Sequence, residues 1–321
     1  MNNAFVLGGT GFVGTRVCEW LANAGWQVTV ASRRGARAGH LLHLPRLSVV
    51  ELDVHDEAAL AQGVAGQHAV VNLVAVLHGT QAAFEQVHVL LPQKLARACV
   101  AAGVSQLVHV SAIGADAQQP DSAPSMYLRS KGRGEAALMR AAESGQRGVF
   151  ELAVLRPSVI FGAGDKFLNV FAQLQKVLPI MPLAGADARF QPVWVEDVAS
   201  AVLRSLERAD GARGSGAPLI LEACGPDVFT LRQLVQLSAR LSGVRGGRGR
   251  PVLALPRWLG RLQAALMELA PGEPLMSLDN LDSLQIDNVA SGKLPGLSYL
   301  GIEGASLVPI ASSYLGANRS C

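Results

Sequence analysis

The sequence is poor in cysteine, and the few cysteines it has are dispersed. Only four of the 321 residues are cysteines, and Cys18, Cys99, Cys224 and Cys321 include no C-x-x-C pair. The seven histidines show no ligand spacing either. A disulfide framework and a metal site are therefore not expected, and we expect reduced thiols in a cytoplasmic protein.

Charge and long hydrophobic runs are also scarce. Charged residues make up 17% of the chain and the net charge is +3, which is too mild to indicate nucleic acid as a partner. No run of about 18 uninterrupted apolar residues occurs, so a membrane span is not expected. The first residues lead directly into an apolar, strand-like run, which predicts no signal peptide. Half of the residues are hydrophobic, so a large folded core is expected instead of disorder.

Strand-like and helix-like patterns alternate along the first half of the chain. Apolar runs typical of strands occupy residues 4–7, 27–31, 48–52, 69–74, 107–111 and 152–156, with helical patterns between them at 12–24, 57–63, 81–102 and 125–144. Such alternation indicates a parallel sheet with helices on both faces. The sequence therefore predicts an α/β fold, a Rossmann-type doubly wound parallel sheet followed by a small C-terminal α+β substrate lobe.

The regular alternation ends near Phe161. We predict a dinucleotide-binding core over residues 1–160 and a smaller substrate or lid lobe over most of residues 161–321. Residues 189–210 are expected to return to the core, because a strand-like run there leads into a helix that opens with Glu196 and Asp197.

A glycine-rich turn lies between the first predicted strand and the first predicted helix. Gly8, Gly11 and Gly14 form a G-x-x-G-x-x-G pattern, which in this position is typical of a dinucleotide-binding loop. The first glycine allows a tight turn, the second lets the backbone approach a pyrophosphate, and the third lets helix and strand pack closely. The free N–H groups at the helix start would bind the phosphates. The predicted phosphate contacts are Gly8, Thr10, Gly11, Phe12, Val13 and Gly14.

The end of the second strand carries cations where an NAD-binding chain usually carries an acid. That acid binds the ribose 2′-hydroxyl, whereas this chain has Ser32, Arg33 and Arg34. A guanidinium binds a 2′-phosphate through charge-assisted hydrogen bonds. The sequence therefore predicts NADP(H), with NAD(H) less favoured. Further cofactor contacts are expected after the third and fourth strands, at Asp53, Val54, Leu73, Val74 and Ala75; for Asp53, capping of an ordinary loop is an equal alternative.

Three polar residues in the second half of the core form a candidate hydride-transfer site. Tyr127 and Lys131 lie four residues apart on a predicted helix, so their side chains share a face. Ser111 ends the fifth predicted strand. An ammonium beside the tyrosine would lower the pKa of its phenol, which otherwise lies near 10. We expect Tyr127 as acid or base and as a cofactor contact, Lys131 as its partner and ribose ligand, and Ser111 as the donor that orients a carbonyl or alcohol.

These motifs resemble the extended or atypical short-chain dehydrogenase/reductases. Within that superfamily the chain is most similar to the branch that holds the nucleotide-binding accessory subunit of mitochondrial respiratory complex I (alpha subcomplex subunit nine) and its bacterial relatives. The resemblance rests on residues 109–115, 127–135, 155–162, 165–169, 190–199 and 287–289. It implies a Rossmann core with NADP(H) and a small lobe over the nicotinamide. By the same resemblance Pro157, Ser158, Val159 and Phe161 would line the nicotinamide.

Three functions follow as alternatives from the motifs and the resemblance. The first is an NADP(H)-binding oxidoreductase that transfers hydride to an apolar carbonyl or quinone-like substrate. The second is a non-catalytic NADP(H)-binding accessory or redox-sensing protein of the respiratory NADH dehydrogenase type, which implies contact with a respiratory complex. The third is a sugar-nucleotide epimerase. The substrate, turnover, the oligomeric state and the physiological partner are left open by the sequence.

One further segment has the pattern of a strongly amphipathic helix. Its apolar residues recur at helical spacing, at Leu255, Trp258, Leu259, Leu262, Leu266 and Leu269. The first interpretation is a lid that packs on the core. The alternative is a surface that contacts a membrane or a partner protein, helped by Arg245, Arg248 and Arg250. Peripheral attachment to the inner face of a membrane is therefore an alternative to a free cytoplasmic location.

Overall fold

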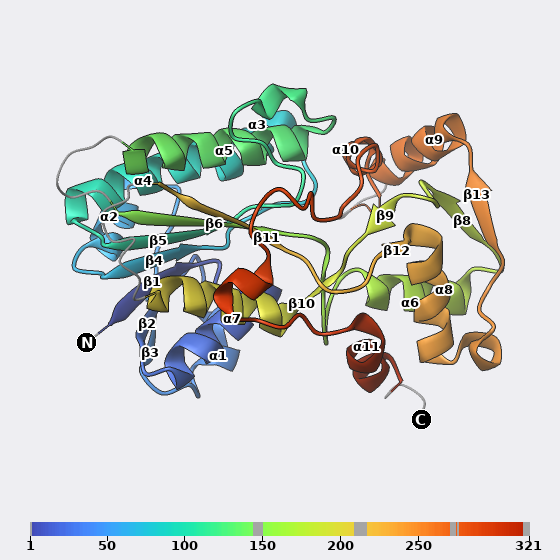
Figure 1. Ribbon diagram of the computed structural model, residues 1–321, viewed down its shortest axis with the longest axis horizontal. Coiled ribbons are helices and arrows are strands. Elements are labelled where there is room, and N and C mark those ends of the chain that lie inside the picture. The colour runs from blue at the N-terminus through green and yellow to red at the C-terminus, as the bar shows by residue number, and fades with distance from the viewer. Residues whose placement is uncertain (1, 144–149, 209–216, 270–273, 275, 317–321) are drawn as a thin grey trace.

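The computed structural model describes residues 2–143, 150–208, 217–269, 274 and 276–316. Cys321 lies outside these residues. The described part is built around one seven-stranded sheet with a smaller group of elements beside it (Figure 1). This arrangement confirms the predicted α/β class and the doubly wound parallel sheet.

All seven strands of the main sheet are parallel, in the order β11-β6-β5-β4-β1-β2-β3. They are β1 (Asn3–Leu7), β2 (Gln27–Ser32), β3 (Leu47–Glu51), β4 (Ala69–Asn72), β5 (Gln106–Val110), β6 (Glu151–Pro157) and β11 (Leu219–Ala223). The six predicted strands of the core are all present. The order reverses between β1 and β4, and ligands of such sheets bind at that point, outside the carboxyl ends of the strands.

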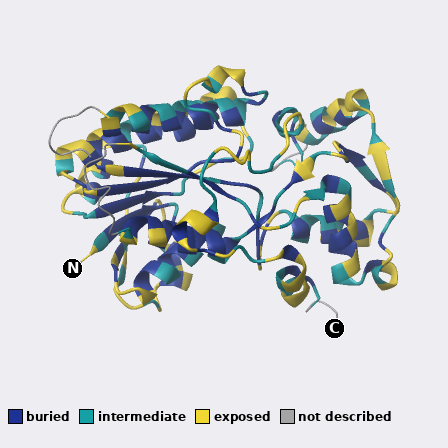
Figure 2. Ribbon diagram, in the orientation of Figure 1, coloured by how far each residue is buried: buried dark blue, intermediate teal, exposed yellow. Residues whose placement is uncertain are grey.

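Helices cover both faces of the sheet because side chains alternate along each strand. On β1, Ala4 and Val6 pack in the core under one layer, whereas Phe5 and Leu7 pack under the other. The first layer holds α1 (Phe12–Asn23) and α7 (Val195–Glu207), and the second holds α2 (Glu57–Val64), α4 (Leu91–Ala102) and α5 (Met126–Glu143). Figure 2 shows the buried strands between these two layers.

The helix expected over residues 81–102 is interrupted. It is divided into α3 (Gln81–Phe84), a π-helical segment η2 (Glu85–Leu90) and α4. Pro92 lies in the first turn of α4 and has no N–H to donate to the carbonyl of His88, four residues earlier. The wider π turn directs His88 into the buried interior, where it is 2% exposed.

The smaller group of elements has its own apolar core. Parallel strands β8 (Met181–Ala184) and β13 (Val252–Leu255) lie beside α6 (Leu168–Val177), α8 (Leu231–Ser242), α9 (Arg257–Glu268), α10 (Leu278–Ser283) and α11 (Leu307–Leu315). Short strand pairs join β7 (Ile160–Phe161) to β10 (Val193–Trp194) and β9 (Arg189–Phe190) to β12 (Phe229–Thr230). Short 3-10 turns are η1 (Gly35–Leu41), η3 (Pro120–Ser122), η4 (Val244–Gly247) and η5 (Leu297–Leu300).

Two segments that follow residue 160 lie with the main sheet. Helix α7 packs on α1, and strand β11 pairs with β6 at the edge of the sheet. The strand expected over 189–195 is two short strands, because Pro192 between them cannot donate a ladder hydrogen bond. The division of the chain into a core and a smaller lobe stays a prediction.

Candidate functional site

The glycine loop lies at the carboxyl end of β1, where the strand order reverses. Gly8 has a φ of +80°, and its carbonyl accepts a hydrogen bond of 3.1 Å from the N–H of Gly11. At Gly14 a Cβ atom would lie 2.1 Å from the Gly8 carbonyl oxygen, so helix α1 can approach the strand this closely only with glycine there. The local geometry is that of a tight strand–turn–helix connection.

The start of α1 offers unpaired backbone donors. Gly11 occupies the N-cap and provides no side-chain acceptor for the first-turn N–H groups, which belong to residues such as Phe12 and Val13. Thr10 lies in the same turn. The segment after β4 borders the loop: a Cβ on Gly8 would lie 3.1 Å from the carbonyl carbon of Leu73 and 3.2 Å from the N of Val74. Ala75 follows and is exposed.

Arg33 and Arg34 follow β2 and are both exposed, with no ion pair among the described residues. The hydroxyl of Ser32 donates to the Arg34 carbonyl at 2.8 Å and shapes the turn. One feature was missed in the sequence: the carboxylate of Glu51, at the end of the adjacent strand β3, accepts a 2.9 Å hydrogen bond from the N–H of Gly35. A carboxylate therefore lies next to the two arginines.

The residues expected near the adenine follow β3. Asp53 is exposed, and its carboxylate accepts from the N–H of His55 at 3.0 Å, which is a local turn contact. Val54 is 8% exposed and packs in the core under α2 and α4. The loop-capping role considered for Asp53 is thus observed, and a cofactor contact for it stays a prediction.

Ser111, Tyr127 and Lys131 come together at the carboxyl end of β5. Lys131 is 1% exposed, and its ammonium donates to the carbonyl of Val110 at 3.1 Å. Tyr127, one turn earlier on α5, packs against an apolar cluster that contains Ala112. Ser111 lies between these two contact points and is 4% exposed; its Oγ has no hydrogen-bond partner among the described residues.

Burial decides the protonation of this cluster. It lowers the pKa of Lys131 to about 8 against the opposing effect of Glu135. It raises the pKa of Tyr127 above its ordinary value. The expectation that the ammonium lowers the pKa of Tyr127 is therefore wrong for this structure, because the ammonium bonds to Val110 and lies 6.0 Å from the centroid of the phenol ring.

Two buried histidines beside the cluster were missed in the sequence. The ring of His88 packs edge-on against Tyr127 at 5.4 Å between centroids, and its Nδ1 lies 2.8 Å from the Ser130 hydroxyl. His109, on β5, pairs through Nδ1 with Asn72 at 3.1 Å, and its Nε2 has no partner among the described residues. Burial, reinforced by Lys131, lowers the pKa of His88 to about 2 and that of His109 to about 3. His88 and His109 each stand alone in an apolar run of the sequence, and this pattern does not distinguish a site residue from a core residue.

The residues expected around the nicotinamide take different positions. Pro157 and Ser158 are buried at the end of β6, and the Ser158 hydroxyl donates to Asn288 Oδ1 at 2.6 Å. The N–H of Val159 donates to the same oxygen at 2.9 Å. Phe161 is fully buried in the core of the smaller group of elements.

A segment near the C-terminus holds the helix of Tyr127. The carboxylate of Asp279, on α10, accepts from the N–H groups of Met126 at 2.6 Å and Tyr127 at 3.1 Å. It therefore caps α5 from outside, at the end where a negative charge is favourable. Farther along α5, the buried Glu135 pairs with Arg156 of β6, with 3.1 Å between Nε and Oε1. The Arg156 pair fixes α5 on the sheet, and the Asp279 cap ties the start of α5 to α10.

Apart from Phe161, which lies in the core of the smaller group of elements, the predicted residues lie at or near the carboxyl ends of β1, β2, β3, β4, β5 and β6, along one edge of the sheet. Several features there fit a dinucleotide: the uncapped start of α1, the close glycine turn, the exposed arginine pair and the unpartnered buried hydroxyl. Among the described residues, no group of three or more His, Cys, Asp or Glu side chains is placed to hold a metal ion.

Comparison with known proteins agrees with this architecture. Residues 4–217 match the model of the NAD dependent epimerase/dehydratase family. The chain is 31% identical to NADH dehydrogenase [ubiquinone] 1 alpha subcomplex subunit 9, mitochondrial, of Rattus norvegicus, over 95% of this chain and 77% of that protein. It is 26% identical to the NADH-ubiquinone oxidoreductase 40 kDa subunit, mitochondrial, of Neurospora crassa, over 99% of this chain and 80% of that protein.

Solved structures show the same fold. MoeE5 in complex with UDP-glucose and NAD aligns with a TM-score of 0.70 at 18% identity and covers 99% of both chains. At this identity the likeness concerns the fold alone. Within the described part of the chain, every helix is too short or too polar to cross a membrane.

Proposed function

Because the chain belongs to the NAD dependent epimerase/dehydratase family, we propose that it is an NADP(H)-dependent oxidoreductase that reduces an apolar carbonyl compound at Ser111, Tyr127 and Lys131. The observation that carries the proposal is the buried Ser111 hydroxyl, which has no partner among the described residues. Ser111 stands in the chain between Val110, which Lys131 contacts, and Ala112, which belongs to the cluster around Tyr127. A buried hydroxyl without a partner is unfavourable, and a substrate oxygen would satisfy it.

The protonation of the cluster favours reduction over oxidation. When bound, NADPH supplies the hydride. Because burial raises the pKa of Tyr127, its hydroxyl carries a proton at neutral pH and can give it to the oxygen of a carbonyl that accepts hydride. Ser111 would donate a hydrogen bond to the same oxygen. Lys131, charged below about pH 8, would bind the ribose.

The surroundings of Tyr127 support an apolar substrate. The ring packs against Ala112, Ala123 and Leu128, and the ring of Phe84 lies edge-on to it at 6.2 Å between centroids. Two cations lie near this cluster: the buried Lys131, and Arg129, whose guanidinium donates to the carbonyls of Ala123 at 3.0 Å and Pro124 at 3.1 Å. The epimerase alternative rests on the family match over residues 4–217 and on structural likeness at the level of the fold.

A substitution at Tyr127 tests the proposal. The wild-type protein, loaded with NADPH, is mixed with a panel of quinones, ketones and aldehydes, and the loss of absorbance at 340 nm is followed. Tyr127→Phe should abolish this oxidation, by at least about a hundredfold, and leave NADPH affinity within about threefold. NADPH bound stoichiometrically by wild type but oxidised by no member of the panel would instead support the accessory function, which the likeness to respiratory-complex subunits favours.

The preference for NADP(H) has its own test. The exposed Arg33 and Arg34 would bind the 2′-phosphate, whereas the nearby Glu51 carboxylate opposes it. Arg33→Asp combined with Arg34→Ala should weaken NADPH binding at least about tenfold more than NADH binding in a fluorescence titration. Equal weakening of the two nucleotides would contradict the assignment of the 2′-phosphate site.

A further inference from the structure

Exposed apolar side chains gather at the end of the smaller lobe, away from the N-terminus. Seven of the fifteen large apolar side chains exposed among the described residues lie here: Val177, Ile180, Leu253, Trp258, Leu262, Leu266 and Leu269. Residues 177–180 directly precede β8, β8 pairs with β13, and β13 leads into α9. These side chains are therefore neighbours in space. Figure 1 places β13 and α9 at this end. We call this set the apolar tip.

Helix α9 supplies most of the apolar tip, and it turns its apolar face outward. The helix rests on its lobe through the small residues Gly260 and Ala264, its only buried positions. Trp258 is 67% exposed and Leu269, just past the helix, is 82% exposed. The prediction that α9 packs on the core as a lid is therefore wrong for this face of the helix.

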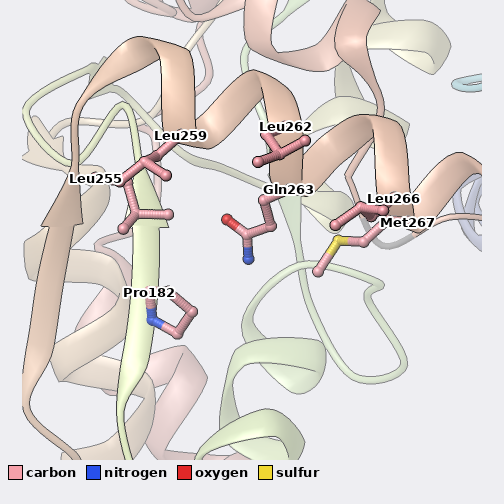
Figure 3. A pocket seen from close by; sticks show the side chains of 7 residues that line it. All are labelled: Pro182, Leu255, Leu259, Leu262, Gln263, Leu266 and Met267. Carbon is pink, nitrogen blue, oxygen red and sulfur yellow. The ribbon is translucent and has the colours of Figure 1, made fainter.

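A groove runs along the inner border of the apolar tip. It lies between α9 and β8 and has a volume of about 550 Å³. Figure 3 shows its lining, which is aliphatic apart from one glutamine: Pro182, Leu255, Leu259, Leu262, Gln263, Leu266 and Met267. The apolar surface therefore includes an open groove beside α9 as well as the exposed face of the helix.

Arginines outnumber acidic residues around the apolar tip. From Arg240 to Leu269 the chain has six arginines and one acidic residue, Glu268, although the net charge of the whole chain is only +3. Arg257 also lies 3.9 Å from the Asp282 carboxylate. Arg245 and Arg248 precede β13, are exposed and have no ion pair among the described residues. The guanidinium of Arg261, on α9, bonds Asp282 of α10 at 2.8 Å and remains 45% exposed.

We propose that the apolar tip docks on the surface of a bilayer that contains anionic lipids. An outward apolar helix face bordered by arginines is the composition that binds in the plane of a membrane interface, with leucines among the acyl chains and cations at the headgroups. An exposed tryptophan at the edge of such a face, here Trp258, is suited to the headgroup level. The docking does not require turnover at Tyr127.

Charge favours the lipid surface over a second copy of this chain. A symmetric dimer through the apolar tip would bring the same arginines of the two copies together, and like charges at an interface are unfavourable. An anionic membrane neutralises them instead. The proposal therefore predicts binding that depends both on the leucines and on the charge of the vesicles.

Vesicle flotation of the full chain tests the proposal. Vesicles of pure phosphatidylcholine are compared with vesicles that contain phosphatidylglycerol in addition, at low and high salt. Wild type should float with the anionic vesicles. Leu262→Glu with Leu266→Glu, and separately Arg245→Glu with Arg248→Glu, should each lower the partition coefficient at least about tenfold. Leu42→Glu, at a leucine that is 65% exposed and lies beside β3 of the main sheet, is the matched control and should bind as wild type does.

Two further measurements distinguish docking on lipid from self-association and from loss of the fold. The fluorescence of wild type should shift to the blue on anionic vesicles, and the shift should vanish in Trp258→Phe. NADPH binding by each variant reports that the fold is intact. Failure of wild type to float, or equal flotation of the leucine variant, would overturn the proposal. The proposal would also be overturned if wild type floated with no vesicle and light scattering showed that wild type is a dimer and the leucine variant a monomer.

Discussion

At the scale of single residues, the end of β5 carries the strongest sign of a ligand. His109 Nε2 and Ser111 Oγ are both buried and lack a partner among the described residues. An unsatisfied buried polar atom costs about 1–3 kcal/mol. Two such atoms beside a buried ammonium and a tyrosine support the proposal that a substrate oxygen binds here.

The two buried histidines predict a stability that falls in mild acid. Their pKa values are lowered to about 2 and about 3 in the folded chain, whereas unfolded histidine titrates near 6.5. Below about pH 6.5 the unfolded chain binds protons that the folded chain does not. The stability is therefore complete above that pH and is lost as the pH falls, by at most about 1.4 kcal/mol per pH unit for each histidine.

Urea unfolding between pH 7.5 and 5 measures this loss. His109→Gln should remove close to half of the contribution that these two histidines make to the slope. Identical slopes for wild type and His109→Gln would show that the buried ring is not kept neutral by the fold.

At the scale of elements, the geometry of the β1–α1 connection leads to a prediction about binding of the proposed cofactor. Gly14→Ala would place a Cβ 2.1 Å from the Gly8 carbonyl oxygen, so α1 must move away from the strand. We expect a loss of about 1–3 kcal/mol in the free energy of unfolding and at least tenfold weaker NADPH binding. Calorimetry and a titration measure both effects. Gly39→Ala is the control, because no atom lies within 4 Å of its added Cβ. Equal losses of stability and NADPH affinity in the two variants would contradict the close approach of α1 to β1.

The elements also show what the sequence could predict. The strands and helices of the core follow from local periodicity, and so do Tyr127 and Lys131 on one helix face. The break at η2 depends on one proline in an otherwise helical pattern, so His88 was missed. The amphipathic pattern of α9 predicted an apolar face correctly, but periodicity does not reveal what covers that face.

At the scale of the whole molecule, the C-terminal segment joins parts that are far apart in the sequence. Asp279 caps α5, Asn288 bonds Ser158, the Ser291 N–H donates to Glu222 of β11 at 2.8 Å, and the Ala305 N–H donates to Asp197 at 2.8 Å. Such contacts span up to about half the chain, and no local pattern reveals them. They explain why the sequence predicted strands well and the neighbours of the candidate site poorly.

The contacts of Asn288 lead to a testable prediction at the scale of the whole molecule. Its Oδ1 accepts from both the Ser158 hydroxyl and the Val159 N–H, at the border between the sheet and the smaller lobe. Asn288→Ala removes the acceptor of the Val159 N–H, whereas the Ser158 hydroxyl keeps the backbone carbonyl of residue 288 at 2.9 Å, and the change should cost about 1–3 kcal/mol in urea unfolding. Asn2→Ala, at an exposed asparagine, should cost little. A cost at Asn288 no larger than that at Asn2 would show that this bridge does not hold the two parts together.

Transfer of deuterium from labelled cofactor tests the central claim most directly. The protein is incubated with an apolar carbonyl substrate from the panel and with (4R)- or (4S)-[4-²H]NADPH, and the product is analysed by mass spectrometry. We predict one deuterium on the former carbonyl carbon from one of the two labelled forms, and none with Tyr127→Phe. Stoichiometrically bound NADPH that keeps its deuterium with every carbonyl and quinone tested would contradict the assignment of Ser111, Tyr127 and Lys131 as a hydride-transfer site.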